Sequence, residues 1–188
     1  HPALEVRSLA AGYGRIPVLH GIDLSVAFDE IVGILGHNGM GKSTLLKTVM
    51  GFLPARSGHV RLADDDITRL KPHDRALRGL GYIPQGRGIF PKLSVAENLR
   101  LAWHDHGEES EADALDRMLA HFPRLYPSLH RDGAPLSGGQ LQLPALAPRL
   151  LGRPCFLLLA EPSACIQPSR ILPLQPPLRT LLSRPCLP

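Results

Sequence analysis

The stretch Gly36-His37-Asn38-Gly39-Met40-Gly41-Lys42-Ser43 matches the pattern G-x-x-x-x-G-K-[ST] and decides the fold. The continuous, β-branched run at residues 31–35 in front of it is typical of a fully buried strand, and a helix is predicted from Lys42 to about Met50, ending at Gly51. Glycines let backbone N–H groups turn inward around phosphates, and the helix N-terminus adds a favourable dipole. Lys42 is therefore expected to reach the β- and γ-phosphates of a nucleotide, and the Ser43 hydroxyl to bind Mg²⁺.

The spacing of apolar residues predicts further short elements on both sides of this loop. A period of two, typical of a half-buried strand, is shown by Ile22, Leu24 and Val26, and another strand is indicated by Leu4, Val6 and Leu9. A second helix is predicted from Pro72, a favourable first helical residue, to Gly79. A short strand at residues 82–83 should follow it.

From Gly86 to about Leu136 the pattern becomes helical. Ser94 and Glu97 have the spacing of a capping box, in which each side chain bonds a backbone N–H of the other residue at a helix start. An amphipathic helix is predicted by Leu115, Met118, Leu119 and Phe122. The fold class that follows is α/β, a mixed sheet interrupted by a helical insert.

Composition excludes several classes of protein. The 188 residues are 44% hydrophobic and 20% charged, with a net charge of +4, and no basic run is long enough to predict a nucleic-acid patch. No run approaches the roughly 18 apolar residues of a membrane span, and no secretion signal is recognised at the start. The cysteines form no CxxC pair, and the segment at 104–106 (His-Asp-His) is interpreted as a solvated loop in place of a metal site.

A phosphate-binding loop alone leaves kinases, GTPases and many ATPases open. The sequence Leu136-Ser137-Gly138-Gly139-Gln140 narrows this choice, because it lies about 95 residues after the loop and about 20 before an apolar strand that ends in Glu161. With these neighbours the chain resembles the ABC ATPase family, whose signature sequence is LSGGQ. The resemblance implies a P-loop NTPase core with an antiparallel β portion and a helical subdomain.

The resemblance also implies roles for individual residues. Tyr13 matches the aromatic residue that stacks on adenine, and Val18 an apolar position beside it. Gln85 matches the Q-loop glutamine, which senses Mg²⁺, and Glu161 the general base that activates the attacking water. The residues expected to contact ATP are Tyr13, Val18, Gly36, His37, Asn38, Gly39, Met40, Gly41, Lys42, Ser43 and Thr44, and, in a head-to-tail dimer, Ser137, Gly138, Gly139 and Gln140 of the second subunit.

Within the family, the chain is most similar to ATP-binding subunits of bacterial branched-chain amino-acid importers. Urea and short-amide importers of the same branch are nearly as close. The similarity lies in four segments, at residues 52–54, 66–70, 84–91 and 166–169. A non-transport ABC protein is the alternative, but such proteins usually carry long coiled-coil inserts or tandem cassettes, and neither is present in this sequence.

Several departures from the family pattern follow Gln140. Ala160 replaces the Walker B aspartate, Pro144 and Pro148 interrupt the helix after the signature, and 163–165 (Ser-Ala-Cys) replaces the start of the D-loop. No histidine follows His130, so the switch histidine of the family is absent from this sequence. Two hypotheses remain: a catalytically impaired nucleotide-binding module, or a damaged sequence of an active ATPase.

The complete expectation is an ABC-type ATPase that binds ATP and Mg²⁺ and drives solute uptake. Residues 1–86 should form the first part of the ATP-binding core, 87–150 the helical subdomain with the signature, 151–169 the returning Walker B strand, and 170–188 an irregular proline-rich tail. The expected partners are a second ATPase subunit, integral membrane permease subunits and, indirectly, a periplasmic binding protein. The expected location is the cytoplasmic face of the bacterial inner membrane, as a peripheral subunit.

Overall fold

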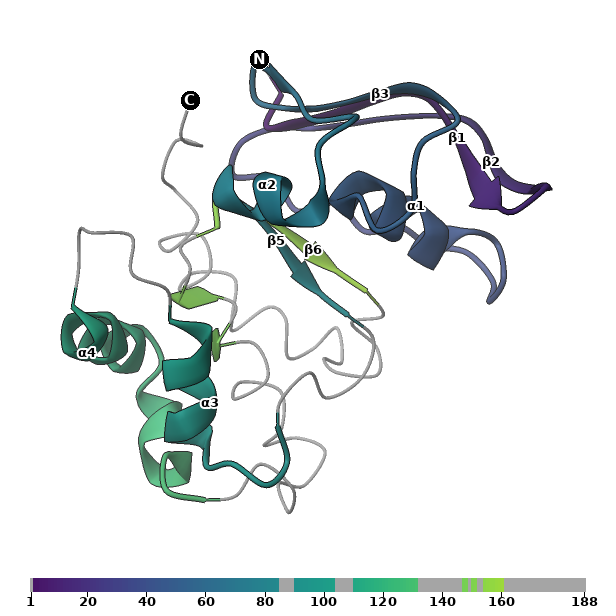
Figure 1. The fold of residues 1–188 in the computed structure, drawn as a ribbon. Coiled ribbons are helices and arrows are strands. Elements are labelled where there is room, and N and C mark those ends of the chain that lie inside the picture. Colours follow the sequence, from purple (N-terminus) through teal and green to yellow (C-terminus); the bar gives the residue numbers. More distant parts are fainter. Residues whose placement is uncertain are drawn as a thin grey trace. The chain divides into compact units, whose positions relative to one another are not determined.

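The computed structural model describes residues 2–84, 90–103, 110–131, 147–148, 150–151 and 154–160 (Figure 1). These residues belong to two compact units. One contains residues 2–82 and 154–160, and the other begins at Ile83 and contains the described helices after it. The first unit carries the glycine-rich loop, and the second carries the capping box.

An antiparallel sheet of four strands forms the start of the first unit. Its strands are β1 (Leu4–Tyr13), β2 (Ile16–Val26), β3 (Ser57–Leu62) and β4 (Asp65–Asp66), in the order β2-β1-β3-β4. Leu4 lies opposite Val26 on one side and opposite Leu62 on the other, so three apolar residues meet at one end of the sheet. The strands predicted at residues 4–9 and 22–26 are confirmed.

Two helices and a second pair of strands complete this unit. Helix α1 spans Lys42–Met50 and ends at Gly51, as predicted. Helix α2 begins at Pro72 as predicted but ends at Leu77, two residues earlier than expected. Strand β5 (Leu80–Ile83), predicted at residues 82–83, pairs with β6 (Phe156–Leu159). These elements alternate between helix and strand, which gives the α/β class.

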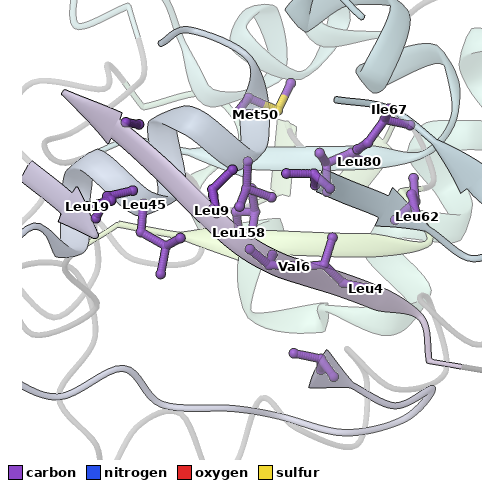
Figure 2. Close-up of a cluster of buried hydrophobic side chains, with 14 residues drawn as sticks. Leu4, Val6, Leu9, Leu19, Leu45, Met50, Leu62, Ile67, Leu80 and Leu158 are labelled. Carbon is purple, nitrogen blue, oxygen red and sulfur yellow. The ribbon is translucent and has the colours of Figure 1, made fainter. Parts of the chain in front are cut away.

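One hydrophobic core joins α1 to strands of both sheets. Side chains from both sheets, from α1 and from the connection after β4 pack together in it, including Leu4, Leu9, Leu45, Met50, Ile67, Leu80 and Leu158 (Figure 2). Leu9 and Ile67 are 0% exposed. The core therefore fixes α1 against both sheets.

The buried strand predicted at residues 31–35 is wrong. These residues are irregular, and four apolar side chains are exposed, from 37% for Ile34 to 95% for Leu35. A central strand can be buried only when neighbouring strands take up its backbone N–H and C=O groups. Within the described residues no strand pairs with 31–35, so this apolar run meets solvent.

Helices form the described part of the second unit. They are α3 (Val95–Ala102), α4 (Glu111–His121) and the 3₁₀ helix η1 (Pro123–Ser128). The capping box of Ser94 and Glu97 is confirmed, and Met118, Leu119 and Phe122 are buried on the predicted amphipathic face. Residues 147, 148, 150 and 151 are helical and buried, so helical structure is present at Pro148; Pro144 lies outside the described residues. No helix in the described ranges is long and apolar enough to cross a membrane.

Candidate functional site

The backbone of the glycine-rich loop turns sharply into helix α1. The Met40 N–H donates to the His37 carbonyl at 3.3 Å, and Gly39 adopts a φ of 85°. Gly41, the N-cap of α1, has a φ of 93°, a left-handed conformation that suits glycine. Because glycine has no side chain and the first turn has no acidic residue, the first N–H groups of α1 receive no cap from their own segment. This helix start is suited to an anionic ligand.

The Lys42 side chain folds back over the loop. Its Nζ donates to the carbonyls of Gly36 at 2.5 Å and His37 at 2.8 Å. The ammonium group therefore lies beside the first residues of the loop, although Lys42 itself is the first residue of the helix. A cation and a row of helix N–H groups thus occur within the same eight residues.

Ser43 and Thr44 occupy the next two positions of α1. The Ser43 side chain is half-buried, whereas Thr44 is 6% exposed. The Thr44 carbonyl accepts a hydrogen bond from Thr48 Oγ1 at 2.8 Å, which ties the first turn to the second. Ser43 consequently presents the more accessible hydroxyl at the helix start.

Strand β2 passes directly against the loop. A Cβ atom placed on Gly41 would lie 3.2 Å from Leu19 Cδ2 and 3.3 Å from Val18 Cγ1. Any side chain at position 41 would therefore press on β2 as well as adopt a strained φ. The structure thus brings Val18 to the loop, and its role beside adenine stays a prediction.

Tyr13 ends β1 on the same hairpin. It pairs with Ile16 of β2 and is 46% exposed, so its ring is accessible. Burial, followed by the electrostatic effect of Tyr13, raises the pKa of the Tyr82 hydroxyl in β5. The Tyr82 ring also makes an edge contact with Phe52, with 5.3 Å between centroids. Tyr13 and Val18 are thus carried by one hairpin beside α1.

Strand β6 ends one residue before the position where the family has its Walker B aspartate. The N–H groups of Cys155 and Phe156 donate to the Gly79 carbonyl at 2.8 and 3.1 Å, which anchors the start of β6 next to β5. Ala160 directly follows β6 and is 5% exposed. Position 160 therefore offers no carboxylate at the described end of this strand.

The remaining predicted site residues lie outside the described residues. They are Gln85, Glu161, Ser137, Gly138, Gly139 and Gln140. Their roles therefore stay predictions. The His-Asp-His segment at 104–106 is likewise outside, and the described part of the chain contains no group of three or more His, Cys, Asp or Glu side chains that could hold a metal ion.

Arg75 is a residue that the sequence pattern did not single out. Its side chain is 3% exposed and donates to backbone carbonyls at the end of α1 and in the turn before α2. Backbone carbonyls carry no residue signature, so no spacing rule could have marked it. Arg75 is thus a buried cation in direct contact with the end of the loop helix.

Comparison with known proteins agrees with this geometry. A family model described as "ABC transporter" matches residues 19–164. The chain is 38% identical over 165 residues to a protein of Archaeoglobus fulgidus named "Probable branched-chain amino acid transport ATP-binding protein LivF", covering 88% of this chain and 70% of that one. It is 37% identical over 174 residues to the "Lipopolysaccharide export system ATP-binding protein LptB" of Escherichia coli K12, covering 90% and 71%.

A solved structure gives the same result. The structure described as an "ATP binding subunit of ABC transporter" superposes with a TM-score of 0.76 and 29% sequence identity, covering 96% of this chain and 75% of the other.

Proposed function

The chain belongs to the ABC transporter family, as an ATP-binding subunit, and we propose that it powers the uptake of branched-chain or related amino acids through a separate membrane permease. The family hydrolyses ATP. The assignment of a solute rests on the four sequence segments and on the similarity to the Archaeoglobus fulgidus protein. The chain is about equally similar to a lipopolysaccharide export protein, so experiments must test both the direction of transport and the transported substrate.

The observation that carries nucleotide binding is the start of α1. Gly41 leaves the helix N–H groups without a side-chain cap, and Lys42 Nζ lies over the loop carbonyls of Gly36 and His37. We infer that the phosphates of ATP bind here, with Lys42 transferring its hydrogen bonds from these carbonyls to the β- and γ-phosphates. The adenine ring stacks on Tyr13 beside Val18.

The residues present are compatible with Mg²⁺ on the phosphates. Ser43 offers an accessible hydroxyl oxygen, and Mg²⁺ prefers oxygen ligands. The side-chain oxygen of Gln85 is proposed as a second ligand. When bound, the ion neutralises phosphate charge. Glu161 is proposed as the general base that would accept a proton from the attacking water.

Two subunits are proposed to act together. The signature residues 137–140 of one subunit would contact the γ-phosphate held by Lys42 of the other, and the pair would dock on the permease at the cytoplasmic face of the membrane. A periplasmic binding protein would deliver the solute to the permease.

A nucleotide titration tests the phosphate assignment. Lys42→Ala should weaken MgATP binding by about 100-fold, because two charge-assisted hydrogen bonds to phosphate are lost. Lys47→Ala is the matched control, since Lys47 lies on the same helix but in its last turn and is exposed. Equal affinities of the Lys42→Ala variant and the unaltered chain would overturn the assignment.

Ala160 favours a second possibility, a nucleotide-binding module with impaired hydrolysis. Without a carboxylate at the end of β6, Mg²⁺ loses an outer-shell anchor, and such losses typically cost about 10–100-fold in affinity or activity. We expect the chain as written to bind ATP and hydrolyse it slowly. Ala160→Asp should raise the rate by a factor within that same range of about 10–100-fold, without full recovery.

Steady-state phosphate release, measured at a protein concentration that favours the dimer, decides between the two possibilities. Ala160→Asn is the matched control, because it adds a side chain of the same size without the charge. Rapid ATP hydrolysis by the unaltered chain, or equal gains from Asp and Asn, would contradict the proposed effect of Ala160.

A further inference from the structure

Arg75 joins the end of the loop helix to the segment before α2. Its Nη1 donates to the carbonyls of Thr48 at 2.9 Å and Val49 at 2.6 Å, both in the last turn of α1. Its Nε donates to Leu70 at 3.0 Å and its Nη2 to Thr68 at 2.7 Å. One guanidinium group therefore bonds four backbone carbonyls from two separate segments.

Backbone carbonyls compensate the buried charge of Arg75. Among the described residues, no carboxylate forms a direct ion pair with it. The last carbonyls of a helix have no partner within the helix and carry its negative dipole end, so a cation is favourable there. Burial lowers the pKa of Arg75, and the more distant charge of Asp66 acts in the opposite direction. Arginine nevertheless stays protonated, so the charge is permanent.

Gly51 gives the guanidinium its space. This residue ends α1 with a φ of 89°, and a Cβ atom on it would lie 2.9 Å from Arg75 Nε and 3.0 Å from Arg75 Cζ. A side chain here would also approach the Leu70 carbonyl, at 3.1 Å. The end of α1 is thus built closely around Arg75.

The position of this joint connects it to the phosphate site. Helix α1 has nine residues, so Arg75 holds one end while Lys42 and Ser43 stand at the other, about 13 Å away. Arg75 itself belongs to α2, which leads through Gly79 into β5, and β5 ends two residues before Gln85. A displacement of the guanidinium would release the end of α1 from the segment before α2.

We propose that Arg75 is a positioning residue for phosphate binding, holding α1 in the orientation that places Lys42 and the helix N-terminus on the phosphates of the nucleotide. This inference rests on the proposed nucleotide function. A purely structural role would make Arg75 important for folding but would leave the affinity of the folded protein for phosphate unchanged.

Binding of two ligands to the folded 188-residue chain separates these roles. MgATP reports on the phosphate site, whereas adenosine reports on Tyr13 and Val18 alone. Affinities are measured at 10 °C by ligand-observed NMR for the unaltered chain, Arg75→Met and Arg75→Lys, with circular dichroism to confirm folding. Arg78→Met is the control, because Arg78 caps the same helix but is half-buried and pairs with Asp65 at 3.5 Å.

Arg75→Met should weaken MgATP binding by about 10-fold or more, because α1 loses its anchoring hydrogen bonds, and should leave adenosine binding unchanged. Arg75→Lys should fall in between, because a single ammonium can replace some of these bonds. Arg78→Met should match the unaltered chain. An unchanged ratio of MgATP to adenosine affinity in Arg75→Met would overturn the inference, whether both affinities are retained or both fall equally.

Two further variants keep the test decisive if Arg75→Met does not fold. Gly51→Ala pushes a methyl group against the guanidinium. Gly51→Ala and Arg75→Lys, as separate variants, should each reduce MgATP affinity without reducing adenosine affinity. An unchanged ratio of MgATP to adenosine affinity in both variants would overturn the inference. If the unaltered chain binds MgATP and these variants bind it equally well, only the role of Arg75 fails. If the unaltered chain binds MgATP no better than Lys42→Ala does, the proposed function fails and the inference with it.

Discussion

The starts of α1 and α3 solve the same physical problem in opposite ways. Every helix begins with backbone N–H groups that have no partner within the helix. At α3, Ser94 Oγ accepts from the Glu97 N–H at 3.2 Å, and Glu97 Oε2 accepts from the Ser94 N–H at 2.7 Å. At α1, Gly41 offers no side chain, the first turn has no acid, and the Lys42 ammonium lies over the loop carbonyls of Gly36 and His37.

The difference separates a structural helix end from a ligand-binding one. The start of α3 is complete without a ligand. Ser94 and Glu97 cap each other, and the carbonyls of Arg131 and Leu129 accept from the N–H groups of Val95 and Ala96. The start of α1 leaves the corresponding groups available to an anion and adds a positive charge beside them. An acid added to the start of α1 should therefore raise stability and weaken binding, whereas removal of the cap of α3 should lower stability and leave binding unchanged.

The largest effect is expected from giving α1 an acid of its own. Ser43→Asp places a carboxylate in the first turn of α1, where it should interact with the helix dipole and raise the free energy of unfolding by about 0.3–1 kcal/mol. The same carboxylate repels phosphate and replaces the hydroxyl, so MgATP affinity should fall by about 100-fold.

Urea unfolding and a MgATP titration of the same samples measure both quantities. Ser43→Asn is the control, because its side chain has the size and shape of aspartate but adds no charge. Unchanged MgATP affinity in Ser43→Asp would mean that the start of α1 is not where phosphate binds.

An intermediate effect is expected at α3. Ser94→Ala removes the N-cap and should lower the free energy of unfolding by about 1 kcal/mol, while leaving MgATP affinity unchanged. Ser94→Thr keeps a capping hydroxyl and should retain most of the stability. A loss of MgATP affinity in folded Ser94→Ala would show that the two helix starts are not independent.

The parts of the fold that could be predicted from the sequence depend on neighbouring residues. The bounds of α1 follow from Lys42 after the glycines and from Gly51, and the cap of α3 follows from a hydroxyl and a carboxylate three residues apart. Each of these signals lies within one turn of the element it sets. Both predictions were therefore confirmed.

The parts that could not be predicted depend on distant backbone. The apolar run at 31–35 has the composition of a central strand, but its burial requires strand partners from elsewhere in the chain. Arg75 is important because of carbonyls at positions 48, 49, 68 and 70, and any residue type can supply a carbonyl. The roles of Gln85, Glu161 and residues 137–140 come from family resemblance and stay predictions.

The smallest effect concerns how the capping box of α3 responds to acid. Hydrogen bonds from the Ser94 N–H, then from its hydroxyl, lower the pKa of Glu97, and Arg100 acts in the same direction. Because the carboxylate is favoured in the folded state, its contribution to stability is fully present above the ordinary glutamate pKa of 4.5 and is lost as pH falls through the lower, folded-state value. Glu97→Gln has no such titration, so it should be less stable than the unaltered chain at pH 7, and the stabilities of the two proteins should converge below pH 4.5.

Urea midpoints at pH 7, 5 and 3 measure this difference in stability. Comparing the two proteins at the same pH cancels the titration of Asp66, whose pKa is lowered by the hydrogen bonds that it accepts from Thr68. A difference that stays constant down to pH 3 would show that the carboxylate charge of Glu97 does not stabilise α3.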